Sequence, residues 1–187
     1  MQKNRCGWCK GDKLYEDYHD FEWGVPVRDD KTSFEFLVLE TFQAGLSWIT
    51  ILRKRENFRE AFDNFDYEKI AQYDEAKKDV LLQNAGIIRN KLKVNATVTN
   101  AQAFMAIQRE FGSFSTYIWN FVDGVPLVNK VEDYRKAPAT TEVSDKISKD
   151  LKKRGFKFVG STVMYAYMQA TGMVNDHETS CFRYEEV

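Results

Sequence analysis

Cysteine and histidine, the residues best suited to hold a metal ion, occur together near both ends of this sequence. Cys6 is separated from His19 by twelve residues, and His177 is separated from Cys181 by three. Thiolate and imidazole are ligands that suit Zn²⁺, and two of each would close a tetrahedral site with no position left for water. Such a site is structural rather than catalytic, and it would tie the two ends of the chain together.

Spacing alone leaves alternatives to this four-ligand site. Cys6-x2-Cys9 is by itself a zinc-knuckle spacing, which would displace His19 from the site. The cysteines are also compatible with small core residues, and the histidines with packed or surface imidazoles. The chain has three cysteines, and an odd number argues against a disulfide framework. Zinc-peptidase chemistry is disfavoured because no histidine follows His177-Glu178 at the required spacing.

A glutamate stands among apolar residues near the end of a strongly helical segment. Glu40 follows Leu37 by three positions and Phe36 by four, so helical geometry places it partly among apolar neighbours. A carboxylate there loses hydration and should be paired, protonated or free to meet a cationic or hydrogen-donating ligand. A solvent-facing glutamate at a helix end is the alternative. Four rings nearby in the sequence would either fill a core or stack on a flat ligand: Trp8, Tyr15, Tyr18 and Trp48.

Positive charge concentrates in residues 53–59, 89–93 and 149–157. If these segments converged, they would form a track for phosphates, whereas separately each is a solvated helix surface. Residues 82–88, with the sequence LQNAGII, suggest the turn of a helix-hairpin-helix, whose backbone N–H groups can hold a DNA phosphate. The match is degenerate, because Ile88 stands where the usual hairpin has its second glycine.

Apolar residues recur at helical intervals along most of the chain. The pattern predicts helices over about 30–44, 48–62, 88–111, 114–121, 143–154 and 162–171, and shorter ones after Asp66 and Asp74. Residues 126–141 are expected to be irregular. Because no segment shows period-two alternation, we expect an all-α architecture of roughly eight to ten helices.

Composition excludes several classes of protein. Hydrophobic residues make up 43% and charged residues 29%, as in an ordinary globular domain, and no apolar run approaches the roughly 20 residues that span a membrane. Lysine and arginine number 27 against 28 acidic residues, so a nucleic-acid partner must be held by a local basic face. The first residues lack the apolar core of a secretory signal, from which we expect a cytoplasmic protein.

Eight blocks of sequence, in order and spread over nearly the whole chain, carry a family resemblance. They are RCGW (5–8), YHD (18–20), EWGVP (22–26), QAGLSWIT (43–50), KREN (54–57), NAGIIR (84–89), KKRGFKFVG (152–160) and VNDH (174–177). Together they resemble the DNA-3-methyladenine glycosylase I family. The resemblance implies an all-α, helix-hairpin-helix DNA glycosylase-like fold with a structural zinc joining the N- and C-terminal segments. We expect one domain over 1–187, with a helix-hairpin-helix region at about 75–111 and zinc-stapled ends at about 1–25 and 172–187.

The same resemblance implies roles for the candidate residues. One Zn²⁺ per chain would be held by Cys6, His19, His177 and Cys181, and Cys9 falls where the family motif has no cysteine. Glu40 would be the catalytic acidic residue that reads the damaged base, with Tyr18 and Trp48 against its faces. Trp8 and Tyr15 would lie nearby. The residues implied to contact DNA are Gln43, Gly45, Leu46, Gly86, Ile87 and Arg89.

The implied activity is DNA repair by hydrolysis of the N-glycosidic bond of 3-methyladenine in alkylated double-stranded DNA. The damaged base would be flipped out of the duplex, released as free 3-methyladenine and replaced by an abasic site. We expect a monofunctional enzyme that acts as a monomer and has no membrane partner. The alternatives are a catalytically silent DNA-binding module and a zinc-stapled helical protein with no role on nucleic acid.

Overall fold

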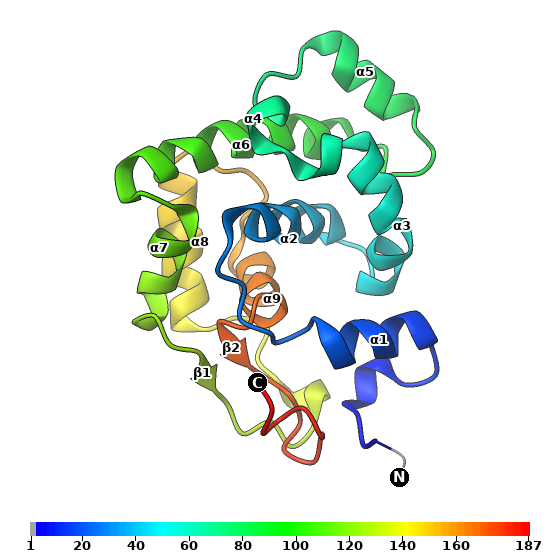
Figure 1. Ribbon diagram of the computed structural model, residues 1–187, viewed down its shortest axis with the longest axis vertical. Coiled ribbons are helices and arrows are strands. Elements are labelled where there is room, and N and C mark those ends of the chain that lie inside the picture. The colour runs from blue at the N-terminus through cyan, green and yellow to red at the C-terminus, as the bar shows by residue number, and fades with distance from the viewer. Residues whose placement is uncertain (1–2) are drawn as a thin grey trace.

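The computed structural model describes residues 3–187, and most of this chain is helical (Figure 1). The helices in this range are α1 (Lys13–Phe21), α2 (Asp30–Gln43), α3 (Trp48–Ala61), α4 (Tyr67–Ile70), α5 (Glu75–Gln83), α6 (Lys91–Phe111), α7 (Phe114–Trp119), α8 (Glu142–Lys153) and α9 (Ser161–Ala170). Short 3-10 turns occur at Gly7–Cys9, Asp63–Phe65, Asn120–Val122 and Tyr134–Lys136. None of the helices in the described part of the chain is long and apolar enough to cross a bilayer. The expected helical architecture is confirmed, with α1 as an unpredicted helix.

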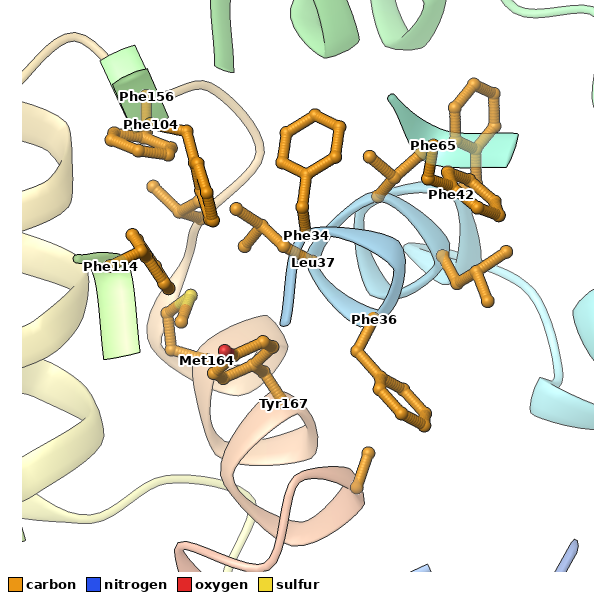
Figure 2. Packing of buried hydrophobic residues seen from close by; sticks show 14 of the residues in the cluster. Phe34, Phe36, Leu37, Phe42, Phe65, Phe104, Phe114, Phe156, Met164 and Tyr167 are labelled. Carbon is orange, nitrogen blue, oxygen red and sulfur yellow. The ribbon is translucent and has the colours of Figure 1, made fainter. Parts of the chain in front are cut away.

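Helix α2 is the centre of the fold, and its neighbours surround it (Figures 1 and 2). Nine of its 14 residues are buried, and Phe34 and Phe36 leave it in different directions to pack on different partners. A helix that is apolar on all sides needs neighbours on all sides, and α3, α6, α7 and α9 all contact α2. Glu40 belongs to this central helix, so its carboxyl lies inside the protein.

Side-chain caps and glycines set the helix ends much as the sequence predicts. Asp29 caps α2 by accepting a hydrogen bond from the backbone N–H of Thr32. Gly112 ends α6 with a φ of 85°, which glycine adopts without a steric penalty.

The start of α6 differs from the prediction. The helix begins at Lys91, because Asn90 caps it and residues 84–90 form the turn that joins it to α5. Ile88, where the predicted helix starts, precedes α6, and Leu92 in the first turn of α6 is 69% exposed. The buried face of α6 carries Val94, Ala96, Ala101, Phe104 and Ile107.

A small parallel strand pair joins the loop after α7 to the C-terminal segment. Strand β1 (Leu127–Val128) pairs with β2 (Val174–Asn175), and a further bridge links Val131 to Glu178. The sequence predicted no strand, because two residues are too few to show an alternating pattern. The pairing places the loop over residues 129–138 beside the C-terminal segment. The two ends of the chain also meet, since the N–H of Phe182 donates to the carbonyl of Asn4 at 2.9 Å.

Candidate active site and metal group

A cavity of about 220 Å³ opens beside α2. The residues that line it are Trp8, Tyr15, Tyr18, Trp23, Glu40, Gln43, Trp48, Tyr134, Ala137, Ala166, Gln169 and Asp176. The structure therefore brings Glu40 and all four rings singled out in the sequence to one cavity wall, although they come from separate elements. Their roles in base binding stay a prediction.

The rings of the cavity form a connected cluster. The Tyr18 and Trp48 rings lie 5.4 Å apart between centroids, and Trp8 meets the Tyr15 ring edge-on at 4.8 Å. Trp8 also meets Trp23 edge-on at 5.0 Å. Rings that pack on one another in this way hold their orientation, so a flat ligand would meet a preformed surface.

The Glu40 carboxyl is the polar group that distinguishes this cavity. Its side chain is buried, and within residues 3–187 its Oε2 has no hydrogen-bond partner. Burial raises the pKa of Glu40 to about 8, so the carboxyl is protonated at neutral pH. The alternative of a solvent-facing glutamate is wrong. The indole N–H of Trp48 also lacks a partner among these residues. Two residues of the cavity wall thus carry an unpaired buried polar atom, and unpaired buried groups are uncommon away from functional sites.

Sequence reasoning missed part of the cavity wall. Asp176 accepts hydrogen bonds from the Tyr165 hydroxyl at 2.6 Å, the Gln169 amide at 2.8 Å and the Asn129 amide at 2.7 Å. It is thus a buried carboxylate with fixed partners, unlike Glu40. Tyr134 reaches the cavity from the 129–138 loop. Trp23 and Asp176 stood inside recognised sequence blocks, but nothing in their local pattern marked them as lining a cavity.

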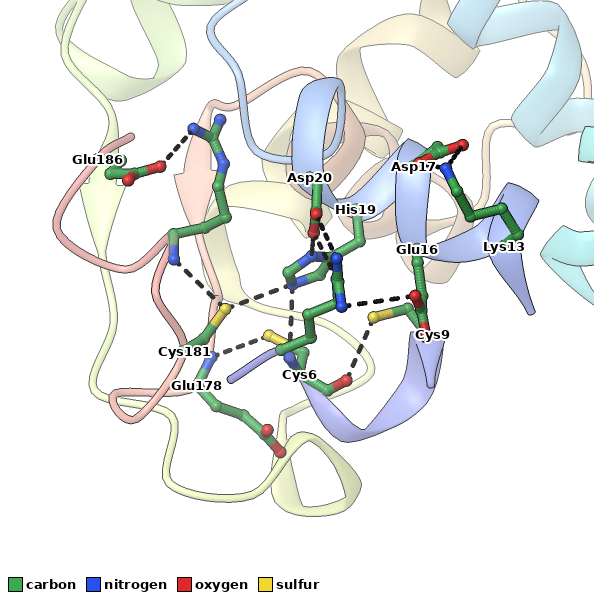
Figure 3. A network of polar contacts seen from close by, with 12 residues as sticks. Cys6, Cys9, Lys13, Glu16, Asp17, His19, Asp20, Glu178, Cys181 and Glu186 are labelled. Atoms are coloured by element: carbon green, nitrogen blue, oxygen red, sulfur yellow. Dashed lines mark hydrogen bonds and ion pairs between the residues drawn. The ribbon is translucent and has the colours of Figure 1, made fainter. Parts of the chain in front are cut away.

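Cys6, His19 and Cys181 form a buried group that could hold a metal ion (Figure 3). Their ligand atoms all lie within 4.8 Å of one another. The backbone N–H of Glu178 points at the Cys6 sulfur at 3.3 Å, and that of Arg183 at the Cys181 sulfur at 3.5 Å. The close pairing of the two thiols lowers the pKa of Cys181 and raises that of Cys6. The group thus favours a thiolate, the form in which cysteine binds metals.

The imidazole of His19 is oriented by a chain of hydrogen bonds. Its Nδ1 lies 2.9 Å from Asp20, which in turn accepts two hydrogen bonds from the Arg5 guanidinium at 2.9 and 2.8 Å. The carboxylate favours a proton on Nδ1, and Nε2 then accepts from the backbone N–H of Cys6 at 3.4 Å and lies 3.4 Å from the Cys181 sulfur. A carboxylate behind a histidine is the usual support of a metal-binding imidazole.

His177, the fourth expected ligand, lies beside this group but outside it. Its ring centroid is 5.1 Å from that of His19, and its Nδ1 lies 3.0 Å from the Asn175 amide oxygen. Its Nε2 is buried and has no partner within the described chain, residues 3–187. Burial lowers the pKa of His177 to about 3, which keeps the ring neutral. A buried imidazole nitrogen with a free lone pair fits an additional metal ligand.

Cys9 is not part of the metal group in the described chain. Its thiol donates to the Cys6 carbonyl at 3.3 Å, and burial raises its pKa to about 12. Cys9 therefore behaves as a small buried residue, and the zinc-knuckle alternative, in which it displaces His19, is not the arrangement observed.

The predicted DNA contacts divide into two turns. Gln43 lines the cavity, Gly45 has a φ of 81°, and Leu46 is 40% exposed. In the other turn, Arg89 is exposed, whereas Ile87 is only 3% exposed and packs in the core.

Two backbone N–H groups of the second turn are paired within the protein. The N–H of Gly86 donates to the Asn84 side chain at 2.8 Å, and that of Ile87 to the Asn84 carbonyl at 3.4 Å. The side chain of Ile87 is thus a core residue, and a DNA contact at this position stays a prediction.

The three basic segments are not equally available to a phosphate. In residues 53–59 the arginines are paired, as Arg55 is with Glu22 and Glu35. In residues 149–157 most lysines are exposed, while Arg154 pairs with Glu110. The first segment therefore ties helices together, and the last keeps exposed positive charge.

A buried, unpaired carboxyl beside a slot of aromatic rings, in a mostly helical protein, has the features of a site for a flat ligand. Comparisons with known proteins identify the family to which this helical protein belongs. The family model described as methyladenine glycosylase matches residues 8–184, and the chain belongs to that family. It is therefore a glycosylase.

Relatives of known structure and name match most of the chain. The Haemophilus influenzae protein named DNA-3-methyladenine glycosylase is 50% identical over 177 residues, which cover 95% of this chain and 96% of that protein. A crystal structure of a 3-methyladenine DNA glycosylase I matches with a TM-score of 0.93 at 50% identity, covering 96% of this chain and 98% of the other. A tyrosine-to-phenylalanine variant solved in complex with 3-methyladenine has a TM-score of 0.92 at 36% identity, with 96% of each chain covered.

Proposed function

We propose that the protein removes 3-methyladenine from alkylated double-stranded DNA, releasing the free base and leaving an abasic site. The observation that carries this proposal is the buried, unpaired carboxyl of Glu40 in a cavity lined with aromatic rings. The names of its relatives, and the complex of one of them with 3-methyladenine, support the choice of base.

Selection of the damaged base follows from charge. Methylation at N3 gives adenine in DNA a formal positive charge, and each stacked ring attracts a cation by roughly 0.5–2 kcal/mol. Tyr18 and Trp48 would supply these rings. The ionised Glu40 carboxylate would accept a hydrogen bond from the amino edge of the base, and such bonds are stronger when the partners are charged and shielded from water. Neutral adenine would gain less from the stacked rings and less from the hydrogen bond to Glu40, because it carries no positive charge.

Access to the cavity requires the nucleotide to leave the duplex. The cost of unstacking is least for a base that already pairs poorly, so a lesion assists its own extrusion. Leu46 is exposed beside the cavity and Gln43 lines it. We propose that these two residues occupy the gap that the extruded nucleotide leaves, and that Arg89 contacts the backbone.

The reaction needs little acid catalysis, because the positively charged base is already a good leaving group. A water oxygen bonds to C1′ of the sugar as the C1′–N9 bond breaks. The electron pair of that bond leaves with the base and neutralises its charge, and the water proton passes to solvent. The second carboxylate on the wall, Asp176, is already engaged by three donors. Glu40 is thus the carboxyl that stays available to the base.

We propose that the metal group holds one structural Zn²⁺ through Cys6, His19, Cys181 and His177. The donor set suits zinc, and the free Nε2 of His177 supports the fourth position. The ion would supply a cross-link between the chain ends and would leave no position for a reacting water. These side chains would thus fix the Trp8 end of the cavity instead of taking part in the chemistry.

Base release is the direct test of the proposed function. Incubation of the purified protein with methylated duplex DNA should release 3-methyladenine, detected by chromatography, and leave abasic sites that alkali converts to strand breaks. Matched unmethylated duplex is the control and should release no base. Duplex binding without release would indicate a DNA-binding module instead.

The protonated state of Glu40 predicts a pH dependence of this reaction. Burial raises its pKa to about 8, so at lower pH a cationic base must displace the proton before it meets a carboxylate. The kcat/KM for base release should therefore rise by up to about tenfold per unit from about pH 6 and level off near pH 8. Tyr15 and Tyr18 stay protonated throughout, because burial raises their pKa values. A flat profile between these values would contradict the assigned role of Glu40.

A further inference from the structure

A buried lysine supports the end of the helix that carries Glu40. Lys93 lies in the first turn of α6 and is 6% exposed. Its ammonium donates to the carbonyl of Phe42 at 2.8 Å and to that of Ala44 at 2.7 Å. These carbonyls belong to the C-terminal end of α2, where the helix has no further N–H groups to offer. Lys93 therefore supplies hydrogen bonds that the helix cannot make itself.

The sequence suggested a different place for this lysine. Lys93 ends the basic stretch 89–93, which is a candidate phosphate-binding surface by composition. Arg89 and Lys91 of that stretch are exposed, but Lys93 is buried. Within residues 3–187 no carboxylate raises the pKa of Lys93, and burial lowers it. Its charge is balanced instead by the two carbonyls and the negative end of the helix dipole.

The carbonyls held by Lys93 belong to the turn proposed to enter the duplex. We call residues 42–46 the wedge turn. Within it the N–H of Leu46 donates to the Gln43 carbonyl at 2.6 Å. The carbonyls of three successive residues are thus engaged, two of them by Lys93. This leaves the exposed Leu46 and the cavity-lining Gln43 on a backbone with little freedom.

A second lysine makes a similar link in the opposite direction. Lys54 of α3 donates to the carbonyls of Ala85 at 3.1 Å and Gly86 at 3.4 Å, in the turn between α5 and α6. That turn leads directly to the start of α6, where Lys93 lies. The two lysines therefore link the two turns that are predicted to contact DNA to each other through the protein.

We propose that Lys93 is a positioning residue for base extrusion, which holds the wedge turn at a fixed distance and orientation from the turn over residues 84–90. The proposal rests on the proposed function. In this arrangement Lys93 contacts neither the base nor a phosphate. It instead determines whether Gln43 and Leu46 meet the gap in the duplex when the backbone is bound at the other turn.

The test separates positioning from base binding and from phosphate binding. Lys93→Met should lower the single-turnover rate of base release from methylated duplex by on the order of 10- to 100-fold, as expected for small errors in placement. Its affinity for free 3-methyladenine should stay within about twofold of the wild type, because the cavity rings are unchanged. The salt dependence of its duplex affinity should also be unchanged, since no phosphate contact is lost.

Two matched variants control for charge and for folding. Lys146→Met removes the same charge from an exposed site on α8, outside the three basic segments, and should retain the wild-type rate. Lys93→Arg keeps a cation with N–H donors and should recover most of the rate. If Lys93→Met melts below the assay temperature, Lys93→Gln, which retains an amide donor, is measured in the same way.

Three results would overturn the proposal. The first is a wild-type rate of base release in Lys93→Met. The second is a weaker dependence of its duplex affinity on salt concentration, by the amount expected for the loss of one phosphate contact. The third is a loss of affinity for the free base in parallel with the rate. Failure of the wild-type protein to release base would instead contradict the proposed function, and the role of Lys93 with it.

Discussion

Replacement of Glu40 by glutamine should remove selective binding of the alkylated base and make the folded protein more stable. Hydrogen bonds to charged groups contribute about 1.5–3 kcal/mol, so kcat/KM on methylated DNA should fall by roughly 10- to 100-fold. The loss should be largest near pH 8, where the wild-type carboxyl is ionised. Calorimetric titration should show that the wild-type protein prefers 3-methyladenine to adenine and that Glu40→Gln has lost most of this preference.

The expected gain in stability follows from the pKa of the same group. An ordinary glutamate has a pKa of 4.5, and burial raises that of Glu40 to about 8. A raised carboxyl pKa favours folding when the group is protonated and disfavours it as the group ionises. The unfolded chain loses its proton near the lower value, so stability falls as the pH rises from 4.5 to about 8. Glutamine cannot ionise, so Glu40→Gln should lack this decline.

At neutral pH this difference amounts to a few kcal/mol, which corresponds to a rise in melting temperature on the order of 5–10 °C for a chain of this size. Thermal melting by circular dichroism between about pH 5 and pH 8 measures it. Glu68→Gln, at an exposed site on α4, removes one negative charge without relieving any burial and should change neither stability nor activity. A Glu40→Gln protein that melts below the wild type, or that keeps full selectivity, would show that this carboxyl is not the buried, base-reading group.

The helices could be predicted from sequence because capping residues and glycines act locally. The central position of α2 could not, since a helix that is apolar on all sides has no polar face for periodicity to detect. Helix α1 was missed for the opposite reason, because its sequence KLYEDYHDF is rich in charge. The start of α6 was predicted too early because Ile88, a residue of the preceding turn, was taken as helical.

In the candidate site, too, residue types could be predicted from the sequence, whereas burial could not. Cysteine and histidine spacing led to the group of Cys6, His19 and Cys181 because ligand types are few and distinctive. Exposure is different, because it depends on packing against distant segments. Lys93 and Ile87 therefore looked like surface residues in the sequence and are buried in the fold.

The metal group and the cavity share a wall, which links stability of the chain ends to base binding. Trp23 meets the His177 ring edge-on at 4.6 Å, and Trp8 meets the His19 ring edge-on at 5.4 Å. Both tryptophans line the cavity. If the histidines were released from a metal, the rings packed on them would lose a fixed support.

Cys181→Ala should therefore lose the metal and weaken base binding, whereas Cys9→Ala should do neither. We expect about one zinc per chain in the wild type and in Cys9→Ala, measured by atomic emission, and little in Cys181→Ala. Amide hydrogen exchange should accelerate in the end segments 3–25 and 172–187 of Cys181→Ala, because the cross-link between them is gone. Affinity for free 3-methyladenine should fall by roughly tenfold as Trp8 and Trp23 lose their support.

The paired cysteine variants make this prediction specific. Both remove a buried thiol of the same size, but only Cys181 belongs to the metal group, while Cys9 donates to a backbone carbonyl. Equal metal loss in both would restore the Cys6-x2-Cys9 pairing as the ligand set. A full metal complement in Cys181→Ala would rule out the proposed ligands. Metal loss with unchanged affinity for 3-methyladenine would show that the rings keep their places without the ion, because their contacts with one another are then sufficient to form the slot.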